Sequence, residues 1–291
     1  MSLTFLFSLL LTGSSLTTSA LAQSPLAPAP EIYKAGAYHA CAVTEGRIRC
    51  WGSNKVGQTR IPQLRGELID LAVGQNHNCV LTTQGVQCWG YNFRGQRDVP
   101  RDLGPVELIA AGFLHSCAAG SWGVRCWGEN RWNQSSPPSD LGPIREMALG
   151  GYHSCVLTMD NEIRCWGDGA PKDIPQGLEQ PHSLTSGLYH LCLMDGQKPL
   201  CFGSNYENQL DIPERLQKVD QIVAGGMHTC ALWGNHQVVE CWGNNNWQQS
   251  SVPALSSPVR LAAGGYCTCV WDAEINNGDD LCWGMMGQLH Q

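Results

Sequence analysis

The chain has 291 residues, and its 18 lysines and arginines stand against 25 aspartates and glutamates, which gives a net charge of −7. Binding to nucleic acid depends on neutralising phosphates with a basic surface, so this balance argues against a nucleic-acid partner and against a role on chromatin. The 15 cysteines favour an oxidising compartment over the reducing cytosol.

The first 22 residues carry no charged side chain and contain an apolar run from Phe5 to Leu11, followed by small residues up to Ala22. This pattern predicts a secretory signal peptide over residues 1–22, although the usual basic start is missing. A membrane anchor is the alternative, but the run is shorter than the ~20 residues that a spanning helix needs. Residues 23–30, rich in Ala, Pro and Ser, are predicted to be a flexible lead. We therefore expect a secreted, periplasmic or cell-surface protein without a membrane span in its mature chain.

One motif recurs along residues 31–291, namely G-x-x-H-x-C followed by C-W-G. Its anchor position steps by 38, 38, 38, 37, 38 and 39 residues through His39, His77, His115, His153, His190, His228 and Cys267. A period of this length and regularity indicates an array built from one supersecondary unit. Residues 31–291 are therefore predicted to form a single repeat domain.

Each repeat is predicted to contain three short strands. The first alternates apolar and polar residues, as in 68–74 and 219–225. The second begins at the anchor residue, and the third ends in Trp-Gly. A polar loop with Asn and Gln follows, and a proline then stops strand pairing before the next unit. Seven such units stacked radially cover both faces of every sheet, which predicts an all-β, seven-bladed β-propeller with its blade tryptophans in the inter-blade core.

The cysteines fall in pairs within each repeat. A hairpin around Glu45 and Gly46 places Cys41 opposite Cys50, and directly opposed residues of this kind are close enough for a disulfide. The same spacing predicts Cys79–Cys88, Cys117–Cys126, Cys155–Cys165, Cys192–Cys201, Cys230–Cys241 and Cys269–Cys282. Zinc is the alternative, but the C-x-x-C pairs typical of zinc sites do not occur in the sequence. Cys267 is left over as a free thiol, a reshuffling partner or an intermolecular link.

The pattern A-G-x-x-H-x-C-A-V, then W-G-x-N-x-x-G-Q, then a proline, seen from Ala35 to Pro62, resembles the regulator of chromosome condensation repeat. Its short period and G-Q-T-x-x-P ending look most like the secreted bacterial branch of type II β-lactamase inhibitory proteins. The cysteines make it similar also to disulfide-laced propellers of bacterial surface proteins and of plant crinkly-type receptors. The resemblance implies a propeller that binds a partner protein on one rim.

Residues that vary between the repeats are candidates for that contact. In the inhibitory branch, the turns before the anchor contact the bound enzyme, and the resemblance carries this role to Tyr38, Phe113, Tyr152, Tyr189 and Tyr266, with Asn76 and Met227 breaking the aromatic pattern. The alternative is that these tyrosines pack on the neighbouring blade. The loops after the third strands add Phe93, Trp132, Tyr206 and Trp247. Aromatic residues gathered on a rigid rim are typical of protein hot spots.

The sequence favours a binding protein over an enzyme, because it contains no G-x-S-x-G, H-E-x-x-H or phosphate-binding glycine loop. The anchor histidines are interpreted as structural groups that bond backbone in the neighbouring turn, the alternative being a ring that holds a metal. We expect a monomer that binds a partner protein and holds neither a cofactor nor a metal. If the resemblance extends to function, the protein inhibits an enzyme. Aromatic platforms beside Asn and Gln would also suit a glycan, so a lectin is the main alternative.

Overall fold

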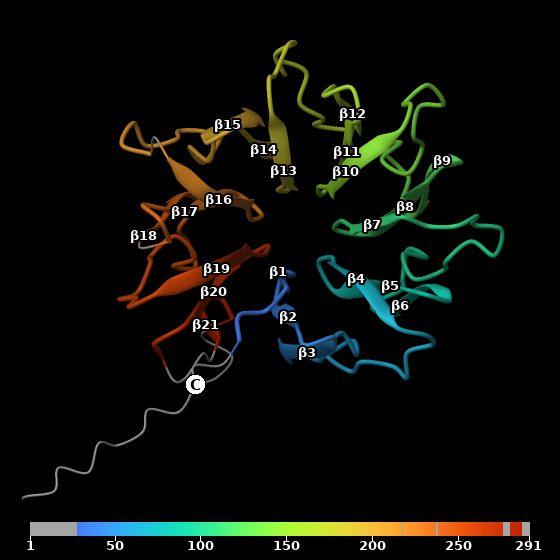
Figure 1. The fold of residues 1–291 in the computed structure, drawn as a ribbon, viewed down its shortest axis with the longest axis horizontal. Helices are drawn as coiled ribbons and strands as arrows, with labels where there is room; N and C mark the ends of the chain where they lie inside the picture. The colour runs from blue at the N-terminus through green and yellow to red at the C-terminus, as the bar shows by residue number, and fades with distance from the viewer. Residues whose placement is uncertain (1–27, 217, 237, 276–279, 287–291) are drawn as a thin grey trace, which may run out of the picture.

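The computed structural model describes residues 28–216, 218–236, 238–275 and 280–286. These residues form seven three-stranded antiparallel sheets arranged around a central axis (Figure 1), which confirms the predicted propeller. The predicted signal peptide and residues 23–27 of the lead lie outside the described residues. Residues 28–30 form no strand, Pro30 is buried, and Ala29 packs against the core between the first and last blades. Within the described ranges, no helix is long and apolar enough to cross a membrane.

Each blade is a meander of consecutive strands. The first strands lie nearest the axis in Figure 1 and are β1 (Ile32–Ala35), β4 (Leu68–Val73), β7 (Leu108–Ala111), β10 (Ile144–Leu149), β13 (Pro181–Ser186), β16 (Val219–Ala224) and β19 (Pro258–Ala263). The second strands are β2 (His39–Thr44), β5 (His77–Thr82), β8 (His115–Gly120), β11 (His153–Thr158), β14 (His190–Asp195), β17 (His228–Trp233) and β20 (Cys267–Asp272). The third, outer strands are β3 (Arg47–Gly52), β6 (Gly85–Gly90), β9 (Gly123–Gly128), β12 (Ile163–Gly167), β15 (Lys198–Gly203), β18 (Val238–Gly243) and β21 (Asp280–Gly284).

All seven predicted disulfides form, and each joins the second and third strands of one blade. In the first blade Cys41 lies opposite Cys50, as the hairpin around Glu45 predicted. The Cα atoms of the bonded cysteines are 4.0 to 4.1 Å apart, the close spacing of a non-hydrogen-bonded pair. A loop of about ten residues closed in this way contributes roughly 2 to 3 kcal/mol in the chain-entropy model.

The hydrophobic core lies between blades. Cys41 and Val43 of the first blade pack with Leu71, Val80 and Trp89 of the second. The next interface repeats this arrangement, with Trp127 packed against side chains of the second blade. The blade tryptophans are therefore inter-blade core residues, as predicted.

A buried hydrogen-bond chain also links each blade to the next. His39 Nε2 lies 2.8 Å from Asn78 Oδ1, and Asn78 Nδ2 donates to the backbone carbonyl of Gln58, which also accepts the indole N–H of Trp89. An amide oxygen only accepts, so His39 carries a proton on Nε2, and burial favours the neutral ring by lowering the pKa of His39 to about 4. The same chain recurs where the histidine partners are Ser116, Ser154, Thr229 and Thr268. The predicted backbone partner of the histidines was wrong, because the partner is a side chain of the following blade.

Two blade interfaces lack this hydrogen-bond chain. At each of them, more than one residue of the chain is replaced. Between the fourth and fifth blades the glutamine is missing, Leu191 and Phe202 replace the hydroxyl and the indole, and His153 instead contacts Ser186 at 2.7 Å. Between the seventh and first blades, Cys267 replaces the histidine and Ala40 its partner. A buried polar group left without its partner costs about 1 to 3 kcal/mol, whereas replacing both by apolar groups can be nearly neutral.

Backbone hydrogen bonds close the ring near the axis. Among the described residues, a residue just after each repeat glycine donates its N–H to the corresponding turn of the next blade, in the pairs Ala37–Gln75, Gln75–Gly112, Phe113–Gly150, Gly151–Gly187, Leu188–Gly226, Gly226–Gly264 and Gly265–Gly36. The last bond, 3.2 Å long, joins the seventh blade to the first. Tyr33, Ala40 and Ala42 pack there against Ala262 and Trp271. The ring thus closes with each described blade formed from one continuous segment.

Cys267 is a free cysteine buried at this seam, where its Sγ lies 3.6 Å from the carbonyl oxygen of Gly36. Its side chain has no exposed surface, and burial raises the pKa of the thiol to about 12. Since the thiolate is the reactive form, we expect no alkylation of Cys267 in the native protein and one alkylated thiol per chain after unfolding without reductant. Mass spectrometry after iodoacetamide treatment measures this, with Cys267→Ser as the control. Alkylation of the folded protein at the rate of a free cysteine would contradict the buried position.

Candidate binding face

One face of the ring carries both sets of predicted contact residues. In every blade, the backbone N–H that follows the third strand donates to the carbonyl of the residue just before the anchor, as in Ser53–Tyr38 and Tyr91–Asn76. These bonds hold the turn between the first two strands beside the loop after the third strand. We call the surface formed by these turns and loops the loop face. The opposite surface, formed by the turns between the second and third strands, is the hairpin face.

The two residues between the repeat glycine and the anchor take different places in the turn. The first of them lines the central channel in each blade, at Ala37, Gln75, Phe113, Gly151, Leu188, Gly226 and Gly265. The second lies beside the loop after the third strand, at Tyr38, Asn76, Leu114, Tyr152, Tyr189, Met227 and Tyr266. The structure therefore separates Phe113 from the tyrosines with which the sequence grouped it. Its blade presents Leu114 at the outer position.

The four tyrosines form two stacked pairs across blade interfaces. Tyr38 stacks on Tyr266 with ring centroids 5.5 Å apart, and Tyr152 stacks on Tyr189 at 5.3 Å. Burial raises the pKa of Tyr38 and of Tyr189, and the stacked phenol adds to the effect. All four side chains are half-buried. Each ring thus packs on the neighbouring blade and still presents surface to solvent, which combines both sequence interpretations.

The loops after the third strands present the more exposed aromatic side chains. Tyr206 is 94% exposed and Phe93 74%, while Trp132 and Trp247 are 46% and 39% exposed. Each of these loops turns at a residue with φ between 59° and 80°, occupied by Gly57, Gly95, Asn133, Asn208 and Gln248. The left-handed turn projects the two residues before it outward, which explains why the aromatic residues at these places are exposed.

The Asn and Gln side chains of the same loops are used within the loops. Asn92 Oδ1 accepts the N–H of Arg97 while its Nδ2 donates to Asp98, and Asn130 bonds Ser135 and Ser136 in the same way. In five of these loops the last glutamine is buried and accepts a backbone N–H two residues before it, at Gln58, Gln96, Gln134, Gln209 and Gln249. Sequence reasoning missed two roles of this glutamine. Its side chain holds the loop, and its backbone carbonyl accepts hydrogen bonds from side chains of the next blade.

Two cavities open on the loop face. One, of about 410 Å³, lies over the first and second blades and is lined by Tyr38, Val56, Asn76, Tyr91 and Met285 among others. The other, of about 360 Å³, is centred on the third blade, and its lining includes Arg94, Glu129, Arg131, Trp132, Tyr152, Asp168 and Tyr189. The two cavities thus differ in character, since the first has mainly uncharged walls and the second contains four charged side chains.

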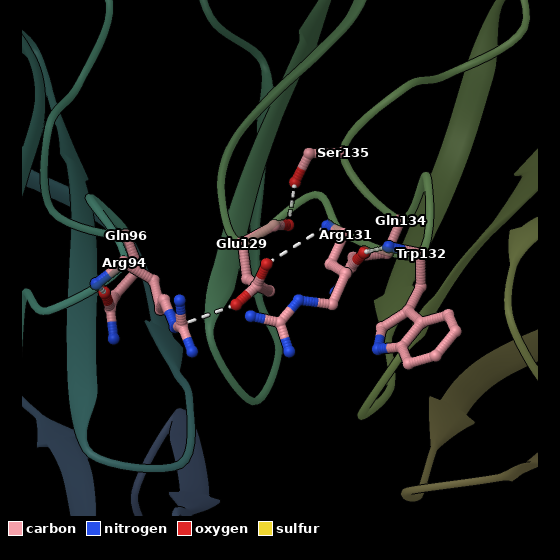
Figure 2. Close-up of polar contacts among 7 residues, drawn as sticks. All are labelled: Arg94, Gln96, Glu129, Arg131, Trp132, Gln134 and Ser135. Atoms are coloured by element: carbon pink, nitrogen blue, oxygen red, sulfur yellow. Dashed lines mark hydrogen bonds and ion pairs between the residues drawn. The ribbon is translucent and has the colours of Figure 1, made fainter.

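The charged cavity has an ordered wall (Figure 2). Arg94 Nε lies 2.8 Å from one carboxylate oxygen of Glu129, whose other oxygen accepts the backbone N–H of Arg131 at 3.0 Å. The backbone of Glu129 accepts the hydroxyl of Ser135, and Trp132 N–H donates to Gln134. The Glu129 side chain is only 13% exposed. It therefore fixes the guanidinium of Arg94 and the start of the Arg131 loop from beneath.

The anchor histidines lie between neighbouring blades and line neither of the two cavities. They are buried, and burial lowers the pKa of His77, His115 and His190 to about 3 and of His39, His153 and His228 to about 4. Their Nε2 atoms bond side chains of the neighbouring blade, and their Nδ1 atoms have no hydrogen-bond partner among the described residues. Over the same residues, no group of three or more His, Cys, Asp or Glu side chains is placed to hold a metal ion.

Known proteins share both the repeat and the fold of this chain. The profile of the regulator of chromosome condensation (RCC1) repeat matches residues 34–58, 68–96 and 144–170. The ectodomain of the Physcomitrella patens receptor kinase CR4 is 27% identical, with a TM-score of 0.70 over 87% of this chain and 72% of that one. The CRINKLY WD40 ectodomain of the Arabidopsis thaliana receptor kinase ACR4 is 22% identical, with a TM-score of 0.68 over 87% and 97% of the two chains.

Prp20p of Saccharomyces cerevisiae, whose structure is described together with its binding to Gsp1p and histones, is 17% identical, with a TM-score of 0.66 over 80% of each chain. The predicted resemblance to the chromosome condensation repeat is confirmed by these matches. The finer resemblance to the secreted inhibitory branch stays a prediction.

Proposed function

We propose that this chain is a secreted, non-enzymatic binding protein that captures another protein on its loop face. The observation that carries the proposal is the pair of stacked tyrosine interfaces, Tyr38–Tyr266 and Tyr152–Tyr189, on the same face as the exposed Phe93 and Trp132. Rigid aromatic side chains that are already held in place lose little conformational entropy on binding, which favours them as hot spots.

The scaffold supports this function in two further ways. Its disulfides indicate an oxidising compartment, which fits an exported protein. The ring of backbone bonds and the inter-blade hydrogen-bond chain hold neighbouring turns in fixed positions, so the loop face is preorganised before a partner arrives. Several solved propellers with similar folds are receptor ectodomains or partner-binding proteins by their own descriptions.

Glycan binding is the less favoured candidate. Sugar recognition needs free amide and carboxylate groups beside the aromatic platform. On this face, Asn92, Asn130, Asn205 and Asn245 donate and accept within their own loops. These amide groups are therefore already bonded within the protein, which suits a protein partner better than a sugar.

Replacing both Tyr152 and Tyr189 by Ala is expected to weaken partner binding by at least about 30-fold, because losing a single hot-spot side chain costs about 2 kcal/mol or more. The partner is first identified by chemical cross-linking of the wild-type chain in the producing cell's envelope and secreted fractions. Binding of the purified partner is then titrated by calorimetry. If the partner is an enzyme, its kcat/KM in the presence of each variant reports whether the loop face covers the active site.

Met159→Ala is the matched control, since Met159 is 58% exposed and follows β11 at the hairpin face. It should bind as the wild type does. Equal affinity of the tyrosine variant and the wild type would place the partner elsewhere and refute the proposal. A wild-type chain that binds a glycan array but no protein, with sensitivity at Trp132 and Trp247, would instead establish the lectin function.

A further inference from the structure

The charged cavity on the loop face has walls of opposite character. Arg94 and Arg131 stand on the side of the second and third blades, where Glu129 is almost covered by the loop it supports. Asp168 lines the cavity from the fourth blade, next to Tyr189. The aromatic side chains of Trp132 and Tyr152 lie in the same lining. A ligand in this cavity therefore meets cations on one side and an anion on the other.

The cationic wall has unused donors. Arg94 contacts Glu129 through Nε and lies with its guanidinium carbon 5.2 Å from the centre of the Phe93 ring, while its two terminal nitrogens make no hydrogen bond or ion pair among the described residues. Arg131 is anchored by its backbone N–H alone, and its guanidinium makes no recorded hydrogen bond or ion pair within that part of the chain. In Figure 2 the Glu129 carboxylate is drawn between the two guanidinium groups. The single carboxylate thus positions both arginine-bearing segments while leaving most of their donors available.

Resting on the proposed function, we propose that the partner protein places an acidic side chain, Asp or Glu, against the donors of Arg94 and Arg131 that Glu129 leaves unused. A guanidinium presents paired N–H donors that match the two oxygens of one carboxylate. Trp132 and Tyr152 line the same cavity, and a partner packed against these rings would displace water, which would strengthen the charge-assisted bonds. The aromatic side chains supply contact area, and the arginines decide which segment of the partner fits.

The acidic residues of the cavity make the choice selective for a single carboxylate. A nucleic acid or another extended polyanion would bring further negative charges against Asp168 on the opposite wall. Like charges brought together in this way oppose binding. An acidic residue flanked by neutral or basic residues fits both walls, since its neighbours then face Asp168 favourably.

A phage-displayed library of disulfide-constrained peptides, selected on the full-length protein, tests this without a known partner. Peptides that lose binding to the Tyr152→Ala, Tyr189→Ala double variant define the loop-face set. We expect this set to share an Asp or Glu, and synthetic peptides with Asn or Gln at that position to bind about ten-fold more weakly. Arg131→Glu should weaken the same peptides by a similar factor.

Lys198→Glu is the matched control, because it makes the same charge change on the hairpin face, where Lys198 begins β15. It should leave the affinities unchanged. Loop-face peptides without an acidic preference, or peptides that bind Arg131→Glu as well as the wild type, would overturn the inference while leaving the proposed function intact. If no selected peptide responds to the tyrosine variant, the proposed function itself fails. Tighter binding of a single-stranded oligonucleotide than of any peptide would also overturn the inference.

Discussion

Acidification from pH 7 to about pH 4 is expected to unfold the protein, with the free energy of unfolding falling most steeply below about pH 6. Burial lowers the pKa of His77, His115 and His190 from the ordinary value of 6.5 to about 3, and that of His39, His153 and His228 to about 4. Between these values and 6.5, the unfolded chain holds protons that the folded chain does not. Protons therefore favour unfolding throughout this window.

The expected size follows from the number of histidines involved. A proton taken up only on unfolding changes the free energy of unfolding by about 1.4 kcal/mol per pH unit, so six of them give a limiting slope of about 8 kcal/mol per unit. The stabilising contribution is complete above pH 6.5 and is lost as the pH falls towards the native pKa values. Urea denaturation at closely spaced pH values, with disulfides intact, measures the slope.

Two single variants calibrate the slope. His77→Gln can still donate to Ser116, and it should remove about one proton from the unfolding reaction while costing roughly 1 to 3 kcal/mol at neutral pH. His182→Gln is the control for replacing a histidine outside the inter-blade layer, because His182 lies exposed on β13. A wild-type free energy of unfolding that is flat between about pH 7 and pH 5 would show that the anchor histidines are charged or accessible in the native state.

Gly264→Ala is expected to lower the free energy of unfolding by more than about 4 kcal/mol, because an added Cβ would overlap the carbonyl oxygen of Gly36. That carbonyl accepts the Gly265 N–H that joins the seventh blade to the first. The colliding atom belongs to the backbone of Gly36, and the added Cβ is fixed by the backbone of residue 264. Rotation of a side chain therefore cannot relieve the overlap. Opening the seam would expose the apolar cluster around Tyr33 and Trp271. The midpoint of thermal unfolding and the rate of limited proteolysis measure the loss.

Gly265→Ala provides the comparison at the adjacent position. Its Cβ would lie 3.1 Å from the Cβ of Ala37, a contact that a small shift can relieve. We expect a loss of about 1 kcal/mol. Insolubility of Gly264→Ala beside a soluble Gly265→Ala would agree with the argument. Similar stability of the two variants would show that the ring tolerates separation at the seam.

The sequence was sufficient for the fold because every level of the pattern agreed. The 38-residue step of the anchor, the opposed cysteines such as Cys41 and Cys50, and the strand limits at His39 and Gly52 all follow from short-range geometry. Local rules of this kind apply once per repeat, and their agreement across the repeats leaves few alternative topologies. The pairing of β2 with β3 in the first blade, and the opposed cysteines of the other blades, were therefore predicted from the sequence.

The candidate site was less predictable, because it depends on contacts between repeats. The motif separates the position of Phe113 from that of Tyr152, but it does not tell which of the two positions faces the axis. The hydrogen bond from His77 to Ser116 joins side chains 39 residues apart. A signal for it existed, since Ala40 follows the blade with Cys267 and Leu191 follows the blade without glutamine. Reading these substitutions as coupled would have revealed the inter-blade chain.

The short spacing of the cysteines within each blade also affects the order in which the disulfides can form. Each of the six bridges from Cys41–Cys50 to Cys230–Cys241 joins neighbouring cysteines only 9 to 11 residues apart, and a segment that short brings its ends together within about 100 ns. An oxidant that acts as the polypeptide emerges can thus form these disulfides one after another, before the ring of blades closes. No exchange between wrongly paired cysteines is needed. Only in the last blade does a neighbouring thiol, Cys267, offer a wrong choice. Burial at the seam afterwards removes that thiol from further exchange.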